Sequence, residues 1–146
     1  METIHILNGP NLNLLGMRET NIYGHKTIND LEDMCRRRAS ENGFQVVFKQ
    51  TNSESTLVDF IQEAIGKSSA IIINAAAYTH TSIAILDALK SFAGYVVEVH
   101  ISDISKREEF RKFSFVSLRA DLVIQGLGLD GYIEAIDKVV EKKVNK

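Results

Sequence analysis

Short runs of apolar residues, rich in β-branched side chains, alternate along the chain with stretches in which apolar residues recur at helical spacing. Each of the five short runs is bounded by turn or polar residues and is too short for a helix, which predicts buried β-strands. These runs are Thr3–Leu7, Phe44–Phe48, Ala70–Ile73, Tyr95–Val99 and Leu122–Ile124.

The stretches between and after these runs predict four amphipathic helices. The first follows Thr27, a suitable N-cap, and ends before Gly43, which can close a helix in the left-handed conformation. The predicted inner faces are Ile28, Leu31 and Cys35; Leu57, Ile61, Ala64 and Ile65; Ile83, Leu86, Leu89 and Phe92; and Ile133, Ile136, Val140 and Val144.

Regular alternation of strands and helices indicates an α/β fold with a parallel sheet, because parallel neighbours need a right-handed crossover. We therefore predict a flavodoxin-like, doubly wound three-layer sandwich with a five-stranded parallel sheet. The 146 residues match the size of one domain, spanning residues 1–146. In such a sheet, ligands bind beyond the carboxyl ends of the strands.

Composition narrows the class of protein. Hydrophobic residues make up 45% of the chain and the net charge is −2, which excludes global disorder and offers no basic excess for nucleic acid. The basic run Arg36–Arg38 lies in a helical pattern and is interpreted as a solvated face. The single cysteine, Cys35, excludes an internal disulfide and is expected to act as a small buried hydrophobe. Without a basic leader or an apolar run of membrane-spanning length, the chain is expected to be cytoplasmic, with no membrane partner.

Polar and titratable residues collect where the predicted strands end. Asn11, Arg18 and Tyr23 follow the first strand, and Asn74 and His80 follow the third. The fourth strand ends with Glu98 and His100. Each residue alone has an ordinary structural interpretation, such as capping a turn, but their convergence on one edge of the sheet indicates a site of chemistry.

The sequence also contains weak signals of a dinucleotide-binding site and of a metal site. The spacing of glycines in Gly126–Gly131 matches a dinucleotide fingerprint, yet too little chain remains for the next strand and its acidic ribose-binding residue. These glycines are interpreted as a tight turn with close helix packing. His80 and His100 have no third ligand nearby in the pattern, so no metal is predicted.

Four sequence blocks together resemble one known family, the type II 3-dehydroquinate dehydratases. The blocks are Asn8–Gly16 with Arg18-Glu19 and Tyr23-Gly24; Asn74 with Thr79–Ser82; Glu98–Ser102; and Arg107–Arg111, with a glycine turn before Tyr132. The resemblance covers nearly the whole chain. It departs from the family pattern at Thr20, Ala76 and Leu118, where proline, glycine and proline respectively are usual.

The resemblance implies a lyase that removes water from the small molecule 3-dehydroquinate to give 3-dehydroshikimate. It implies no metal and no cofactor. The reaction would serve the shikimate pathway of chorismate and aromatic amino acid biosynthesis, or quinate breakdown. It also implies a homo-oligomer, a dodecamer built as a tetramer of trimers.

Roles carried over from the family fall on matching positions. Tyr23 would be the base and His100 the general acid. Arg18 would sit beside Tyr23 on a mobile loop, Asn11 would help to hold a water on the enolate, and Glu98 would orient His100. The substrate-binding positions would be Asn74, His80, the amides of Ile101 and Ser102, Arg111, and Asp87 from a neighbouring subunit.

The chemistry of the reaction explains these residue types. A free tyrosine has a pKa of about 10, so a nearby cation such as Arg18 is needed to favour the tyrosinate of Tyr23. The enolate that follows needs pre-aimed hydrogen-bond donors. Hydroxide leaves poorly unless an acid such as His100 protonates it. Glu98, two residues earlier on the strand, points to the same face as His100.

The amides of Ile101 and Ser102 would suit a carboxylate if they precede the helix that we predict over Ser105–Lys112. The lysine at a predicted strand end, Lys49, is interpreted as solvated, which argues against a Schiff-base mechanism. A non-catalytic binding or assembly module that retained the fold remains the main alternative, although such a protein would not need a matched acid and base.

Overall fold

The computed structural model describes residues 1–17 and 20–144, except for the side chains of residues 22 and 23. Within these residues, five strands form one parallel sheet, as predicted, and their order is β2-β1-β3-β4-β5. The strands are β1 (Glu2–Asn8), β2 (Phe44–Gln50), β3 (Ala70–Asn74), β4 (Tyr95–His100) and β5 (Leu122–Gln125).

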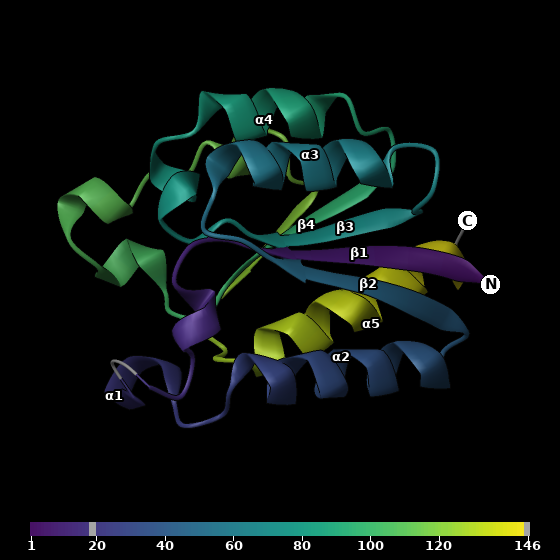
Figure 1. Cartoon of the computed structure of the whole chain (residues 1–146), viewed down its shortest axis with the longest axis horizontal. Coiled ribbons are helices and arrows are strands. Elements are labelled where there is room, and N and C mark those ends of the chain that lie inside the picture. Colours follow the sequence, from purple (N-terminus) through teal and green to yellow (C-terminus); the bar gives the residue numbers. More distant parts are fainter. Residues whose placement is uncertain (18–19, 145–146) are drawn as a thin grey trace.

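Helices cover both faces of the sheet and make the predicted three layers. Figure 1 shows α3 and α4 on one face and α2 and α5 on the other. The α-helices are α1 (Thr20–Tyr23), α2 (Ile28–Glu41), α3 (Glu54–Ala64), α4 (Ile83–Lys90) and α5 (Asp130–Val144). The described part of the chain also forms five short 3-10 helices: η1 (Leu12–Leu14), η2 (Ala76–His80), η3 (Ile104–Lys106), η4 (Glu109–Arg111) and η5 (Val116–Leu118).

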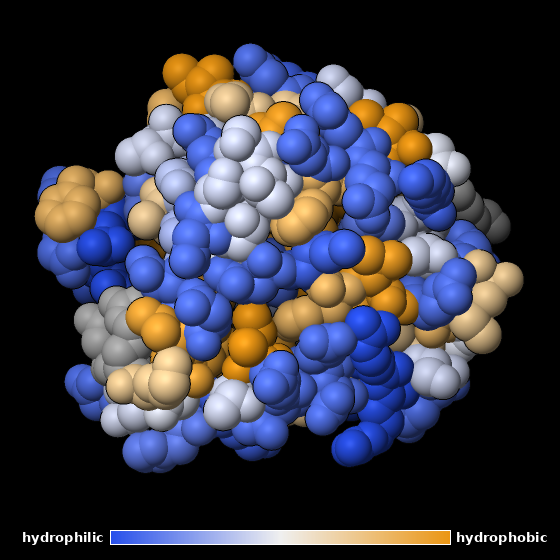
Figure 2. All heavy atoms as spheres, viewed as in Figure 1, coloured by the Kyte–Doolittle hydropathy of each residue, from blue (hydrophilic) through white to orange (hydrophobic). Residues whose placement is uncertain are grey.

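The core divides into two clusters because neighbouring strand residues point to opposite faces of the sheet. Ile4 and Ile6 of β1 pack on the side of α2 and α5, whereas Leu7 packs on the side of α3 and α4. Cys35 is fully buried in the first cluster, as predicted, and burial raises the pKa of its thiol to about 12. On the outer surface, apolar side chains form small groups among hydrophilic ones (Figure 2).

Local signals set the starts of the helices. Thr27 forms a capping box with Asp30: its hydroxyl accepts the Asp30 amide at 3.2 Å and its own amide donates to the Asp30 carboxylate at 2.9 Å. The hydroxyls of Ser53 and Ser82 cap α3 and α4 by accepting the amides of Thr56 and Ile85. These bonds satisfy amides that a helix leaves unpaired at its first turn.

Three predicted helical faces differ from the observed ones. In α5 the buried positions are Gly131, Tyr132, Ala135, Ile136 and Val139. Ile136 is thus buried as predicted, whereas Ile133 and Val140 are only partly buried. The predicted face residue Val144 is 75% exposed. Ile65 and Ile83, also predicted as inner residues, are 42% and 56% exposed because each lies at a helix end, beyond the sheet.

The predicted helix over Ser105–Lys112 is wrong. The chain forms η3 and η4 instead, separated by extended backbone at Arg107 and Glu108. The Asp103 carboxylate accepts the Ser105 amide at 3.0 Å and caps the start of η3. The side chain of Arg107, which lies at this break, donates to the Ser102 hydroxyl at 3.0 Å.

Two further features concern the chain as a whole. In the part of the chain that the structure describes, no helix is long and apolar enough to cross a membrane. The glycine turn between β5 and α5 places Gly126 and Gly128 at φ of 81° and 62° and brings Gly131 against Val99 and Ile124. It is therefore a tight turn with close helix packing, as predicted.

Candidate active site

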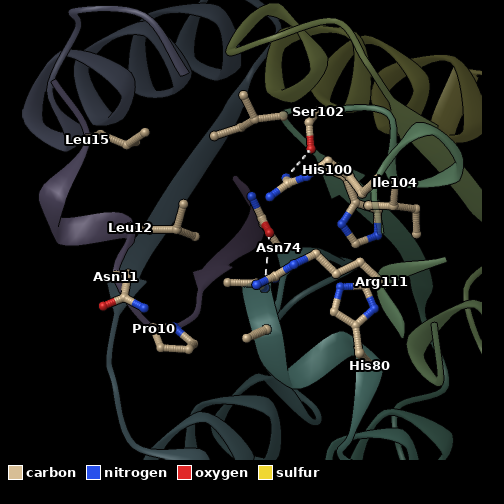
Figure 3. Close-up of a pocket in the computed structure, with 14 residues that line it drawn as sticks. Pro10, Asn11, Leu12, Leu15, Asn74, His80, His100, Ser102, Ile104 and Arg111 are labelled. Carbon is tan, nitrogen blue, oxygen red and sulfur yellow. Dashed lines mark hydrogen bonds between the residues drawn. The ribbon is translucent and has the colours of Figure 1, made fainter. Parts of the chain in front are cut away.

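A cavity of about 170 Å³ opens at the carboxyl ends of β1, β3 and β4, the edge where sequence reasoning placed the site. In Figure 3, Pro10, Asn11 and Leu12 face His80, His100 and Arg111 across it. The full lining is Pro10, Asn11, Leu12, Leu15, Asn74, Ala76, Ala77, His80, His100, Ile101, Ser102, Ile104, Arg107 and Arg111. Seven of the predicted site residues thus meet in one wall: Asn11, Asn74, His80, His100, Ile101, Ser102 and Arg111.

The loop after β1 approaches the loop after β3 backbone to backbone. The Gly9 amide donates to the Asn74 carbonyl at 2.8 Å, and a Cβ atom at Gly9 would lie 2.3 Å from the carbonyl oxygen of Ala75. Such a contact is too short for any side chain, so only glycine fits here. Asn11 then turns the chain at φ of 70°, and its amide donates to the Asn52 side chain at 3.0 Å.

Asn74, at the end of β3, is fixed by a buried phenol. The Tyr132 hydroxyl donates to the Asn8 side-chain oxygen at 2.7 Å and accepts from the Asn74 side-chain nitrogen at 3.0 Å. Burial raises the pKa of the Tyr132 hydroxyl far above its usual value, despite the bond from Asn74. It therefore stays protonated and works as a brace between β1 and β3 rather than as a base.

The side-chain oxygen of Asn74 holds the first residues of the loop that follows β3. This oxygen accepts the Ala76 amide at 3.1 Å, and Ala76 lies at φ of 53°, in the left-handed region. This conformation costs an alanine roughly 1–2 kcal/mol and costs glycine little. The family's usual glycine at this position, noted above, is explained by that backbone geometry.

Glu98 and His100 form a buried pair on β4. Nε2 of His100 is hydrogen-bonded to Oε2 of Glu98, and the two side chains are 5% and 1% exposed. Burial raises the pKa of the Glu98 carboxyl, but the hydrogen bond and charge of His100, followed by hydrogen bonds from Ser114 and Ser117, outweigh it. The pKa of Glu98 therefore lies below its usual value, which favours the carboxylate.

This pairing decides which nitrogen of His100 can do chemistry. With Nε2 directed at Glu98, Nδ1 is the ring atom that can exchange a proton with a molecule in the cavity. The glycine turn supports the strand end from behind, where Gly126 and Gly128 donate to the carbonyls of His100 and Ile101 at 3.3 and 3.0 Å. The arrangement suits a general acid with a fixed orientation.

The remaining polar wall combines a second imidazole with two guanidinium groups. Nδ1 of His80 lies 2.7 Å from the Phe113 carbonyl, so Nδ1 donates and Nε2 is left as the nitrogen that can meet a ligand. Arg111 and Arg107 both lie near the Glu108 carboxylate, at 2.6 and 3.7 Å. Cations at this rim suit an anionic ligand such as a carboxylate.

The other four predicted site residues differ in what the structure describes of them. Arg18 and the side chain of Tyr23 lie outside the described residues. Glu98 lies behind His100 rather than on the surface of the cavity. Asp87 is exposed on α4 and is not among the lining residues, and its predicted role in the site of a neighbouring subunit stays a prediction.

Sequence reasoning missed several residues that shape the site. Arg107 had been noted only as part of a matching block, yet it lines the cavity and holds Ser102. The hydroxyls of Ser114 and Ser117 were not singled out, although both donate to Glu98. Short hydroxyl side chains in a segment without periodicity give no signal that could have identified them. Within the described ranges, 1–17 and 20–144, no group of three or more His, Cys, Asp or Glu residues is placed to hold a metal ion.

Comparison with known proteins gives consistent results over nearly the whole chain. The family described as dehydroquinase class II matches residues 2–140. The 3-dehydroquinate dehydratase of Cereibacter sphaeroides (strain ATCC 17029) is 56% identical over 137 residues, covering 94% of this chain and 93% of that protein. The 3-dehydroquinate dehydratase 2 of Agrobacterium fabrum is 54% identical over 140 residues, covering 96% and 95%. The crystal structure of a type II dehydroquinase from Propionibacterium acnes matches with a TM-score of 0.93 and 42% identity, covering 97% of each chain.

Proposed function

Because the chain belongs to the class II dehydroquinase family, we propose that its cavity binds 3-dehydroquinate and eliminates water from it to give 3-dehydroshikimate. The chain is thus an enzyme of the dehydratase class, a lyase. The observation that carries the mechanism is the buried pair of Glu98 and His100, which presents one ring nitrogen to the cavity. The reaction would serve aromatic amino acid biosynthesis through the shikimate pathway, or quinate breakdown.

Tyr23 is the proposed base for the first step. It takes the proton from the carbon next to the ketone, and the cation of Arg18 favours its ionised form. Both residues follow the loop that Asn11 turns, and α1 begins two residues after Arg18. The support for these roles is the match of the first sequence block to the family, together with the position of that block beside the cavity.

His100 is the proposed acid for the second step. Its Nδ1–H protonates the departing hydroxyl, while Glu98 holds Nε2 and balances the charge of the imidazolium. The enolate formed in between carries negative charge on oxygen and needs directed donors. Asn11 is proposed to hold the water that supplies one of them.

The substrate's hydroxyls and carboxylate are assigned to the polar wall. Asn74 has one N–H bonded to Tyr132, so its second N–H can donate to a hydroxyl, and Nε2 of His80 can accept from one. Arg111 and the amides of Ile101 and Ser102 are proposed to bind the carboxylate. They line the side of the cavity near the cationic rim.

We propose that the active form is a homo-oligomer, a dodecamer arranged as a tetramer of trimers. Asp87 of one subunit would then complete the site of its neighbour. The exposure of Asp87 on α4 leaves its carboxylate accessible for such a contact. A cytoplasmic location agrees with the expected pathways.

Ultraviolet absorbance of the purified protein with 3-dehydroquinate tests this function, because the product contains a conjugated enone and the substrate does not. A sample treated with borohydride in the presence of substrate is assayed in parallel. Turnover that survives the treatment supports elimination without a lysine Schiff base. Bound substrate without turnover would instead support a non-catalytic binding module.

A further inference from the structure

Three hydroxyl groups, two buried and one on an exposed turn, surround the buried carboxylate of Glu98. Ser117 Oγ lies 2.5 Å from Oε1, and Ser114 Oγ lies 2.6 Å from Oε2. Thr79 Oγ1 lies 2.5 Å from Ser114 Oγ and 3.5 Å from Oε2. With Nε2 of His100 also on Oε2, both carboxylate oxygens have at least one close partner.

The number of protons on these groups fixes the direction of the hydrogen bonds. Each hydroxyl carries a single proton, so Ser114 can donate to Glu98 only if Thr79 donates to Ser114. A relay therefore runs from Thr79 through Ser114 to Oε2, and Ser117 donates separately to Oε1. An ionised carboxylate only accepts hydrogen bonds, so this shell of donors is matched to the charged form of Glu98.

We propose that Ser114 and Ser117 are positioning residues that keep the proton shared by Glu98 and His100 on the imidazole ring. The inference rests on the proposed function of His100 as the general acid. It assigns these hydroxyls a part in catalysis although neither of them lines the cavity.

The location of the shared proton determines how strong an acid the ring is. On the ring, it makes an imidazolium, whose Nδ1–H can be given up to a leaving group. On Glu98, it leaves a neutral imidazole, whose Nδ1–H is a far weaker acid, while the total charge of the pair is unchanged. Donors to Glu98 favour the first arrangement because they stabilise the charged carboxylate more strongly than the carboxylic acid that would replace it.

Among the described residues, His100 is the titratable group that interacts with Glu98. On the neighbouring strands, Ile73 of β3 and Val123 of β5 are its register partners, and both are apolar. The shift in the pKa of Glu98 likewise comes from His100, Ser114 and Ser117 in addition to burial. A change at either serine should therefore act on the pair rather than on a wider charge network.

The two serines belong to a surface segment that also supports the other histidine. The Phe113 carbonyl accepts from His80 at 2.7 Å, and the Phe115 amide donates to the Thr79 carbonyl at 2.7 Å. Ser117, at the exposed turn η5, can be replaced with little effect on packing. It is the better of the two serines for mutagenesis, because Ser114 is buried.

The test compares Ser117→Ala with Ser117→Thr, which keeps a hydroxyl, and with Ser40→Ala, a matched change on the exposed end of α2. We expect Ser117→Ala to lower kcat about tenfold, equivalent to about 1.4 kcal/mol in the barrier, with KM within about twofold because no substrate contact is removed. Ser117→Thr should recover most of kcat, and Ser40→Ala should match the parent.

A second readout does not depend on turnover. In nitrogen-15 spectra of histidine-labelled free protein, Ser117→Ala should show a smaller fraction of doubly protonated His100 rings than the parent at the same pH. An unchanged ring spectrum, or a Thr variant as impaired as the Ala variant, would overturn the proposal. If the parent itself does not dehydrate 3-dehydroquinate, the proposed function fails, and the ring spectrum still decides the role of the serine.

Discussion

Replacing Tyr132 by phenylalanine removes a single oxygen from the centre of the molecule and tests the brace between β1 and β3. The ring keeps its place in the core, so packing is nearly unchanged. The lost hydroxyl leaves the Asn8 oxygen without its donor and one N–H of Asn74 without its acceptor. Asn8 is fully buried and Asn74 is 4% exposed, so water cannot readily replace the hydroxyl.

The expected cost follows from these two orphaned groups. Each buried polar group left without a partner costs about 1–3 kcal/mol. The variant also avoids the cost of burying the hydroxyl, which offsets the loss by about 1–3 kcal/mol. We therefore expect the free energy of unfolding of Tyr132→Phe to fall by about 2 kcal/mol.

Urea unfolding, followed by circular dichroism, measures this change as a shift of the midpoint with an unchanged slope. Tyr95→Phe, at the half-buried first residue of β4, is the matched control and should differ from the parent by less than about 0.5 kcal/mol. A loss below about 0.5 kcal/mol in Tyr132→Phe would refute the reasoning. Because Asn74 would be less firmly held, KM should also rise.

Two further predictions concern a buried histidine and a subunit contact. Burial lowers the pKa of His5, although the hydrogen bond and charge of Glu63 oppose this. Below about pH 6.5, His5 therefore binds a proton more readily in the unfolded chain than in the folded one. The free energy of unfolding should then fall as the pH is lowered from about 7 to about 5. Urea titrations at several pH values measure this dependence, which His5→Gln should weaken. If the free energy of unfolding changes with pH equally in parent and variant, the prediction is contradicted. Asp87→Ala should lower kcat/KM because the neighbouring site loses a carboxylate. If size-exclusion chromatography shows that the parent protein is a fully active monomer, this subunit contact is excluded.

Much of the fold follows from short-range signals in the sequence. The five apolar runs became the five strands, and Thr27 and Gly43 bound the first long helix as predicted. Parallel order then brings the strand ends together, which is why Asn74 and His100 meet in one wall although they are distant in sequence. Local pattern and the crossover rule were sufficient for this step.

The parts that were missed depend on contacts across space. The buried face of α5 includes the ring of Tyr132 beside the predicted Ile136, and the periodicity of the aliphatic residues does not indicate that ring. The segment after β4 has no repeating pattern, so neither its 3-10 turns nor the approach of Ser117 to Glu98 could be predicted. The roles assigned to Arg18 and Tyr23 remain predictions from the family resemblance, because those side chains lie outside the described residues.

The central claim is elimination by a tyrosinate base and a histidine acid, and Tyr23→Phe tests it most directly. The measurement is kcat for 3-dehydroquinate in the parent and the variant, with binding of the substrate followed separately by calorimetry. The account predicts that the variant binds substrate with an affinity near that of the parent while losing nearly all turnover. A variant with near-normal kcat would contradict it.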